Sequence, residues 1–331
     1  MKKIIFLFLV VLCLLITGCG NSSEMSIVKN LEKKYSKLKS YEVSGELIVH
    51  NNDDVYNYDI LVSYLKDNYY RVEFTNKSND HKQILLKNDE GLYVLTPSLN
   101  KSFRFQSEWP YQNSQIYLVE TLVKDIVSDK NRKFEKKDDN YVFSTKVNYP
   151  NNSKLINQKI IYDENLKPLK VSVFDDKGIE KMVMEYKKVK LSPKIDKKIF
   201  DVDTIMDSKS EEKTDEVGVL EDVIYPLFLP NGTKLVNEDI IKKDNGERVI
   251  MTYDGEKSFL LVEETADVFD EFTVIPTSGE PFLLMDSLGI VTDNSLSWTS
   301  SGIDYYIVSD VMSGEELIEV AQSIGGTLSI K

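Results

Sequence analysis

Apolar residues recur at every second position along much of the chain between residues 41 and 105. In the first run Val43, Leu47 and Val49 alternate with polar residues, and a similar run begins after the turn residues 51–54. Successive side chains of a β-strand point to opposite faces of a sheet, so a period of two indicates strands with one buried face. Short polar turns separate the runs, which predicts an antiparallel meander of about six strands.

Two segments have the helical period instead. Residues 25–38 place Ile27 and Tyr35 on one face, and residues 116–127 form a second amphipathic stretch. About four further strand-like runs follow within residues 141–189. A curved antiparallel sheet, a half-barrel wrapped on the two helices, is the simplest way to bury every apolar face. We therefore predict an α+β fold.

The chain also divides along its length. Residues 203–221 lose the alternation and become acidic and polar, which predicts a linker. The segment before it, 25–202, would form the half-barrel, and residues 222–331 would form a smaller C-terminal α+β domain whose last helix begins at Ser313. The middle of the linker, 207–216, has no apolar residue to offset the entropy of ordering it. We expect two independently folding domains.

The N-terminus has the composition of an export signal. Lys2 and Lys3 precede an apolar run over residues 4–16, and small residues precede Cys19. The run has 13 residues, too few to cross about 30 Å of hydrocarbon as a helix. We expect cleavage of a signal peptide at residues 1–18.

The end of this leader, Ile16-Thr17-Gly18-Cys19, resembles the bacterial lipobox. The resemblance implies that the Cys19 thiol carries diacylglycerol, that the chain is cut just before it, and that the new N-terminus receives an acyl chain such as palmitate. More than one chain anchors a protein durably, because each buried CH₂ contributes about 0.8 kcal/mol. Residues 19–24 would then be a tether on the extracytoplasmic face of the cell membrane. Cys13 leaves with the leader, so the mature chain has no internal disulfide.

The charge balance and the scarcity of histidine limit the classes of function. The chain has 41 Lys and Arg against 54 Asp and Glu, a net charge of −13, which opposes the binding of nucleic acid. Its two histidines, His50 and His81, are expected to be exposed and cannot supply a multi-histidine metal site. The sequence also lacks a phosphate-binding glycine loop and a nucleophile elbow. We therefore predict a binding protein, not an enzyme, without catalytic residues, metal or cofactor.

The clustered carboxylates give one alternative to that prediction. Glu263, Glu264 and residues 267–271 lack the spacing of a calcium loop and are interpreted as a solvated acidic surface. A carboxylate-dependent hydrolase assembled from distant strands remains an alternative, because one sequence does not show which carboxylates meet.

Two segments carry a resemblance to a known superfamily. Residues 91–105, followed by an apolar helix, and residues 160–202 resemble the superfamily of the lipoprotein carrier LolA and the sensor RseB. The shared features are Asp163 and Pro168, a turn over residues 175–178, and a closing segment that ends in a buried Phe200. The resemblance covers about residues 25–202 and implies a half-barrel fold.

The C-terminal part extends this resemblance. Residues 224–326 resemble a small domain of Gram-positive sporulation lipoproteins, and the whole chain is similar to the YdcC-type sporulation lipoproteins and more distantly to the clostridial germination lipoprotein GerS. The resemblance implies a binding module of the cell envelope that acts in sporulation or germination and has no catalytic residues. An envelope-stress sensor of the RseB type is an alternative within the same superfamily.

The concave face of the half-barrel is the candidate site. It could enclose a lipid or an apolar peptide, or the two helices could fill it completely, because periodicity shows burial but not a void. Trp109 could gate such a cavity or belong to the core. If the face is filled, the protein would position a partner such as a cell-wall hydrolase, as the resemblance to GerS implies. The candidate lining residues are Tyr56, Tyr58, Ile60, Val62, Tyr64, Tyr70, Val72, Phe74 and Trp109.

Overall fold

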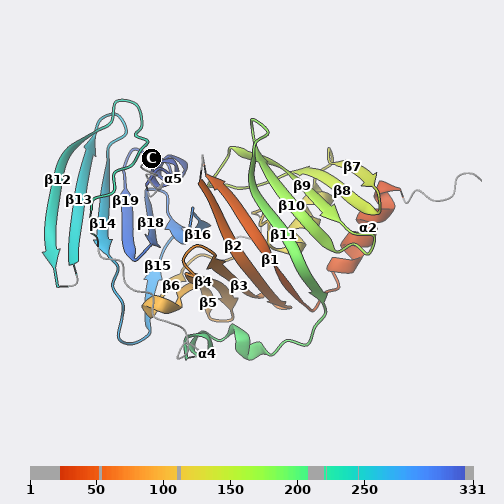
Figure 1. The fold of residues 1–331 in the computed structure, drawn as a ribbon. Coiled ribbons are helices and arrows are strands. Elements are labelled where there is room, and N and C mark those ends of the chain that lie inside the picture. Colours follow the sequence, from red (N-terminus) through yellow and green to blue (C-terminus); the bar gives the residue numbers. More distant parts are fainter. Residues whose placement is uncertain are drawn as a thin grey trace, which may run out of the picture.

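The computed structural model describes residues 23–51, 54–109, 113–207, 220, 222–244 and 246–324. The signal peptide, Cys19 with most of its tether, and positions 208–219 of the expected linker lie outside the described residues. Figure 1 shows a larger and a smaller sheet side by side, with helix α2 at the end of the larger sheet that is far from the smaller one.

The larger sheet has twelve strands in the order β15-β6-β5-β4-β3-β2-β1-β11-β10-β9-β8-β7. Its first elements are α2 (Glu24–Tyr35), β1 (Ser40–Asn51), β2 (Asp54–Leu65), β3 (Tyr69–Asn76), β4 (Lys82–Asn88), β5 (Gly91–Thr96), the 3₁₀ turn η1 (Pro97–Leu99) and β6 (Lys101–Phe105). After them come α3 (Val119–Ser128), β7 (Lys133–Lys137), β8 (Asn140–Lys146), β9 (Leu155–Tyr162), β10 (Pro168–Asp175) and β11 (Glu180–Leu191). The predicted curved sheet with two helices is confirmed. The strand β7 was not predicted, because its sequence KFEKK has a single apolar residue and no alternation.

The two helices begin and end close to the predicted positions. Ser23 caps α2 by accepting a hydrogen bond from the Ser26 backbone N–H, which satisfies one of the free donors at a helix start. One face of α2 buries Ile27 and Leu31, and α3 buries Leu122 and Ile126 in the same core cluster as the concave side of the sheet. Burial of a side chain of this size contributes about 1.5–3 kcal/mol, so helices and sheet stabilise one another.

The smaller sheet has seven strands in the order β12-β13-β14-β19-β18-β17-β16. They are β12 (Lys234–Lys243), β13 (Gly246–Asp254), β14 (Phe259–Thr265), β16 (Glu280–Leu283), β17 (Leu288–Val291), β18 (Ser295–Ser300) and β19 (Ile303–Val308). Helix α5 (Gly314–Ala321) packs on this sheet. Its start has the expected capping box, in which the Glu316 backbone N–H donates to Ser313 Oγ and the Ser313 backbone N–H donates to Glu316 Oε2. The predicted smaller α+β unit is present.

The junction between the two units differs from a simple linker. After the turn η2 (Lys197–Phe200), helix α4 (Val202–Asp207) occupies the first positions of the expected linker and buries Ile205 and Met206 against the larger sheet. Strand β15 (Thr273–Thr277) follows β14 in the chain but pairs in parallel with β6, and so joins the larger sheet. The domain boundaries and the independent folding of the two units stay predictions. Because β15 belongs to the C-terminal part of the chain but pairs with β6, the two units share a sheet.

Candidate functional site

The predicted lining residues form the core of the half-barrel. Tyr58, Ile60, Val62, Tyr70, Val72, Phe74 and Trp109 are buried, and Tyr56 and Tyr64 pack against them half-buried. The register explains a row of rings among them, because Tyr41 lies opposite Tyr64 and Tyr64 lies opposite Tyr70. Ring centroids along the row are 5.0 Å apart in both pairs, and Tyr70 stacks on Trp109 at 4.6 Å. Aromatic pairs at such distances add about 0.5–1.5 kcal/mol each beyond burial.

A half-buried acid lies at the end of this row. The Tyr41 hydroxyl donates a 2.6 Å hydrogen bond to Glu120 Oε2, in the first turn of α3. Burial raises the pKa of the Glu120 carboxyl above its usual value, although the hydrogen bond from Tyr41 acts in the opposite direction. Sequence reasoning missed Glu120, since a single acid at a helix start looks like an ordinary capping charge.

The structure has an open cavity elsewhere, between the two units. It has a volume of about 510 Å³ and is bounded by the end of β1, the 113–117 and 149–155 segments, residues 280–285 and α5. Trp109 is the one predicted lining residue that borders it, and the other eight lie in the core cluster of the half-barrel or pack against it. That those eight residues enclose a ligand therefore stays a prediction. Ligand sites commonly lie at such junctions between units.

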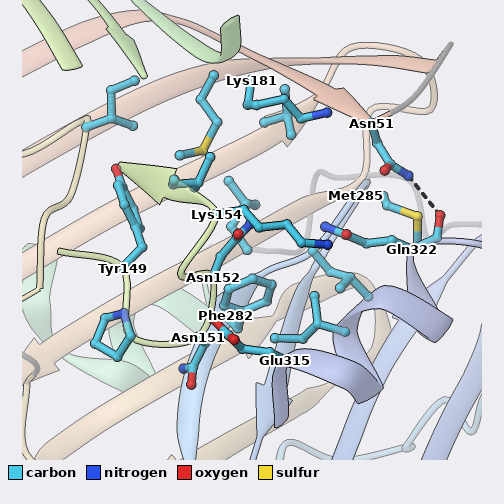
Figure 2. Close-up of a pocket in the computed structure, with 18 of the residues that line it drawn as sticks. Asn51, Tyr149, Asn151, Asn152, Lys154, Lys181, Phe282, Met285, Glu315 and Gln322 are labelled. Carbon is cyan, nitrogen blue, oxygen red and sulfur yellow. Dashed lines mark hydrogen bonds between the residues drawn. The ribbon is translucent and has the colours of Figure 1, made fainter. Parts of the chain in front are cut away.

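The cavity lining is chemically mixed. Figure 2 shows Tyr149 on one side of the cavity, Phe282 and Lys154 in the middle, and Gln322 and Glu315 on the side of α5. Half of the lining residues are apolar or aromatic, namely Val49, Leu85, Trp109, Ile116, Tyr117, Tyr149, Pro150, Leu155, Met182, Phe228, Pro281, Phe282, Leu283, Leu284, Met285 and Ile318. The polar and charged ones include Asn51, Asn113, Gln115, Asn151, Asn152, Lys154, Asp175, Lys177, Lys181, Glu280, Glu315, Glu319 and Gln322.

Hydrogen bonds and an ion pair cross from one unit to the other around the cavity. Asn51 Nδ2 donates to the Gln322 carbonyl at 2.8 Å, the contact drawn in Figure 2. Ser153 Oγ donates to Glu315 Oε2 at 3.1 Å. Lys154 pairs with Glu319, one turn further along α5. These contacts fix the position of α5 against the 149–155 segment.

Among the described residues that line the cavity, Gln115 and Tyr149 each have a buried polar atom without a hydrogen-bond partner. Gln115 Oε1 is buried and accepts no hydrogen bond from a described residue. A buried acceptor without a donor costs about 1–3 kcal/mol, so a bound group that donates to Gln115 would be favoured.

The two histidines and the clustered acids differ from expectation. His50 and His81 are half-buried, and His50 borders the cavity. Glu263 is 0 % exposed, so the interpretation of this residue as solvated surface was wrong. Glu264, on the opposite face of the strand, pairs with Arg248 at 2.7 Å and Lys243 at 2.8 Å. Adjacent residues of a strand face opposite sides of the sheet. The side of Glu263 is covered by other parts of the chain, whereas Glu264 lies on the other side.

Glu263 is held by a backbone donor. The Ile224 N–H donates to Glu263 Oε2 at 3.0 Å, while Oε1 has no partner among the described residues. Burial raises the pKa of Glu263 to about 7, and the Ile224 hydrogen bond limits the shift.

The described ranges contain no group of three or more His, Cys, Asp or Glu side chains placed to hold a metal ion. Within the same ranges, every helix is too short or too polar to cross a membrane.

Comparison with known proteins identifies the family. The family model described as sporulation protein YdcC-like matches residues 1–200. The sporulation protein YdcC of Bacillus subtilis is 36 % identical over 322 residues, which cover 96 % of this chain and 94 % of that protein.

Solved structures give more distant likenesses. The MucA/MucB complex of Pseudomonas aeruginosa matches with 14 % identity and a TM-score of 0.33, covering 89 % of this chain and 98 % of that one. The complex of the CwlD amidase with the GerS lipoprotein from Clostridioides difficile matches with 19 % identity and a TM-score of 0.23, covering 51 % and 96 %. The YdcC match extends over nearly the whole of both sequences, and the chain belongs to the YdcC-like family of sporulation proteins.

Proposed function

We propose that the chain is a lipid-anchored extracytoplasmic protein of sporulating cells, and that the cavity between its two units holds a segment of a protein partner. Family membership supports the role in sporulation. The leader with Cys19 supports the anchor, through the lipobox resemblance. No catalytic role is proposed.

The mixed lining of the cavity is the observation that carries the choice of a protein partner. A site for an acyl chain needs a predominantly apolar wall, whereas Lys154, Lys181, Glu280 and Glu315 border this cavity together with several amides. Amides and charges of both signs can instead pair with a polypeptide backbone and its side chains. The aromatic row of the half-barrel belongs to a cluster of mutually packed side chains, which supports placing the partner in the cavity between the units instead.

The class of partner to test first is a cell-wall hydrolase. This is the class of partner that the resemblance to GerS implies. By binding such an enzyme, the chain would hold it at the membrane surface through the anchor at Cys19. The RseB-type sensor is the second version, in which the partner is a membrane protein of a signalling pathway.

The anchor has its own test. The intact mass of protein extracted from membranes should equal residues 19–331 plus diacylglycerol and an acyl chain, and Cys19→Ala should release the protein from the membrane. A mature mass without added acyl groups would refute the anchor.

The partner is tested by crosslinking from the cavity. A photoreactive phenylalanine analogue at Asn152, which is half-buried in the lining, should crosslink to one protein in sporulating cells. The matched control is the same analogue at Ile179, which is 54 % exposed and outside the cavity. Crosslinks to lipid alone, or equal yields from both positions, would contradict the proposal.

Filling the cavity gives a functional readout. Met182→Trp adds volume at the cavity wall near the start of β11, and should lower both the crosslinking and the sporulation or germination yield of a complemented strain. Ile179→Trp is the control in the same region of the chain. Native mass spectrometry of residues 20–331 should show the bare polypeptide, since a co-purifying lipid would favour the apolar-ligand version.

A further inference from the structure

The free edge of the smaller sheet is long and has exposed aliphatic side chains between its charged ones. Strand β12 is the outermost strand, pairs with β13 on one side, and lies at the outer end of the molecule in Figure 1. Nine of its ten residues are exposed, and only Lys243 is half-buried. Four large aliphatic side chains, Leu235, Val236, Ile240 and Ile241, are 37–54 % exposed. An edge strand presents unpaired backbone donors and acceptors, which makes it a template for another strand.

The other sheet edges are protected from such pairing. β15 contains Pro276 and β16 contains Pro281, and proline cannot donate to a neighbouring strand. β7 has five residues, of which four are charged, and dense charge also discourages pairing. β12 is longer than each of these strands, has no proline and has two adjacent isoleucines.

We propose that β12 pairs in antiparallel fashion with β12 of a second copy of this chain, with Ile240 opposite Ile240 of the second copy. A two-fold axis normal to the sheet relates the strands, so each residue keeps its face and the interface closes as a dimer. This register overlaps residues 237–243 of both copies.

Complementary charges on the two strands favour a second copy of this chain as the partner of β12. In this register Glu238 lies opposite Lys242 of the second copy, on both sides of the axis, and Asn237 lies opposite Lys243. Opposite charges across strands are favourable, whereas like charges are not. If the two-fold axis is moved one residue towards the N-terminus, Asp239 lies opposite Asp239 of the second copy. If it is moved two residues, Glu238 lies opposite Glu238 of the second copy. Both registers place like charges opposite each other.

The charges concerned are available for this pairing. Lys242 makes no ion pair with any other residue in the described part of the chain. The Tyr225 hydroxyl donates to Glu238 Oε2 at 2.7 Å, which leaves the other carboxylate oxygen for a second partner. The whole chain has a net charge of −13, and two copies therefore repel in most orientations. β12 has three lysines against two acids, so copies can approach along this strand.

A disulfide tests the register. The chain from residue 20 onward has no cysteine, so Ile240→Cys introduces a single thiol. Opposite Cα atoms in an antiparallel pair are about 4.5–5.5 Å apart, within the range of about 4.4–6.8 Å that a disulfide spans. Mild oxidation should therefore give a covalent dimer. Val236→Cys, equally exposed on the same strand but far from its own counterpart, is the control. Equal dimer yields from both variants would overturn the register.

Charge reversal tests the dimer itself. Sedimentation equilibrium of residues 20–331 should show a monomer–dimer equilibrium, and Glu238→Lys or Lys242→Glu alone should raise its dissociation constant about tenfold. A mixture of the two variants should form heterodimers, because both contacts are then opposite in charge. A chain that stays monomeric, that assembles beyond two copies, or that dimerises regardless of these variants would overturn the proposal. Neither experiment depends on the cavity or on the lipid anchor.

Discussion

The Tyr58 hydroxyl donates a 2.6 Å hydrogen bond to the backbone carbonyl of Met285, and so joins β2 of the larger sheet to a residue 227 positions later in the chain. Both partners are buried. A second buried contact follows between the Gln83 side chain and the Leu288 backbone, and Lys101 pairs with Asp304 at 3.0 Å. The two units therefore meet along a line of polar contacts that water does not reach easily, where each lost partner is costly.

Removing the Tyr58 hydroxyl should destabilise the whole chain. Tyr58→Phe leaves the Met285 carbonyl buried without its donor, and we expect the free energy of unfolding to fall by about 1–2 kcal/mol. Urea unfolding followed by circular dichroism measures this loss. Tyr306→Phe, at a ring that is 42 % exposed, should change it little. Equal effects of the two variants would contradict the prediction.

Limited proteolysis should cut the chain first within residues 207–216, where there is no apolar residue to order the segment. The structure adds that the two fragments should stay together on gel filtration, because β15 is hydrogen-bonded to β6. Fragments that separate and each keep a dispersed amide spectrum would instead establish the independent folding expected from the sequence. A C-terminal fragment that unfolds on separation would show that it depends on docking.

The stability of the chain should decrease as the pH rises through the titration of Glu263. Burial raises the pKa of this acid from 4.5 to about 7. Between pH 4.5 and about 7, Glu263 is therefore mostly protonated in the folded chain and mostly ionised in the unfolded chain. The free energy of unfolding then falls as the pH rises across this window, by on the order of 3 kcal/mol if the group titrates alone.

Glu263→Gln should remove that pH dependence. The amide oxygen still accepts from the Ile224 N–H, and the variant should be more stable than the native chain at pH 8 and similar to it near pH 5. Glu264→Gln, which removes the negative charge that pairs with Arg248 and Lys243, should have the opposite sign at pH 8, by about 1 kcal/mol or less. Thermal unfolding at several pH values measures both. A pH profile unchanged by Glu263→Gln would refute the assignment.

A single methyl group at Gly45 should weaken the larger sheet. The pairing of β1 with β11 shifts register between Ser44 and Gly45, and a Cβ at position 45 would overlap the Glu185 carbonyl oxygen. Gly45→Ala should lower the free energy of unfolding by about 1–3 kcal/mol, since backbone in the middle of a sheet cannot move aside freely. Ser44→Ala is the neighbouring control and should remain within about 0.5 kcal/mol. Denaturant unfolding of both variants distinguishes them.

The strands and helices of the half-barrel could be predicted because their signals are local. A period of two or of 3.6 residues is a property of a short segment, and the runs through Val43 and Val62 or through Ile27 and Leu31 show it without reference to the rest of the chain. β7 lacks such a signal, since the neighbouring strand β8 positions it and its own side chains bury little. The same reasoning placed the capped start of α5 at Ser313.

Local patterns in the sequence are enough to predict which faces of the elements are apolar, and from these the half-barrel, its two helices and the family. Which surfaces stay open depends on how the two units pack together. The cavity is bounded by Asn51, Tyr149, Phe282 and Gln322, which are far apart in the chain and meet only because the units dock. Alternation likewise shows that Glu263 and Glu264 face opposite sides, but the segment of Ile224 decides which side is covered. Burial of a residue depends on what packs against it from elsewhere, and a local period contains no information on that contact.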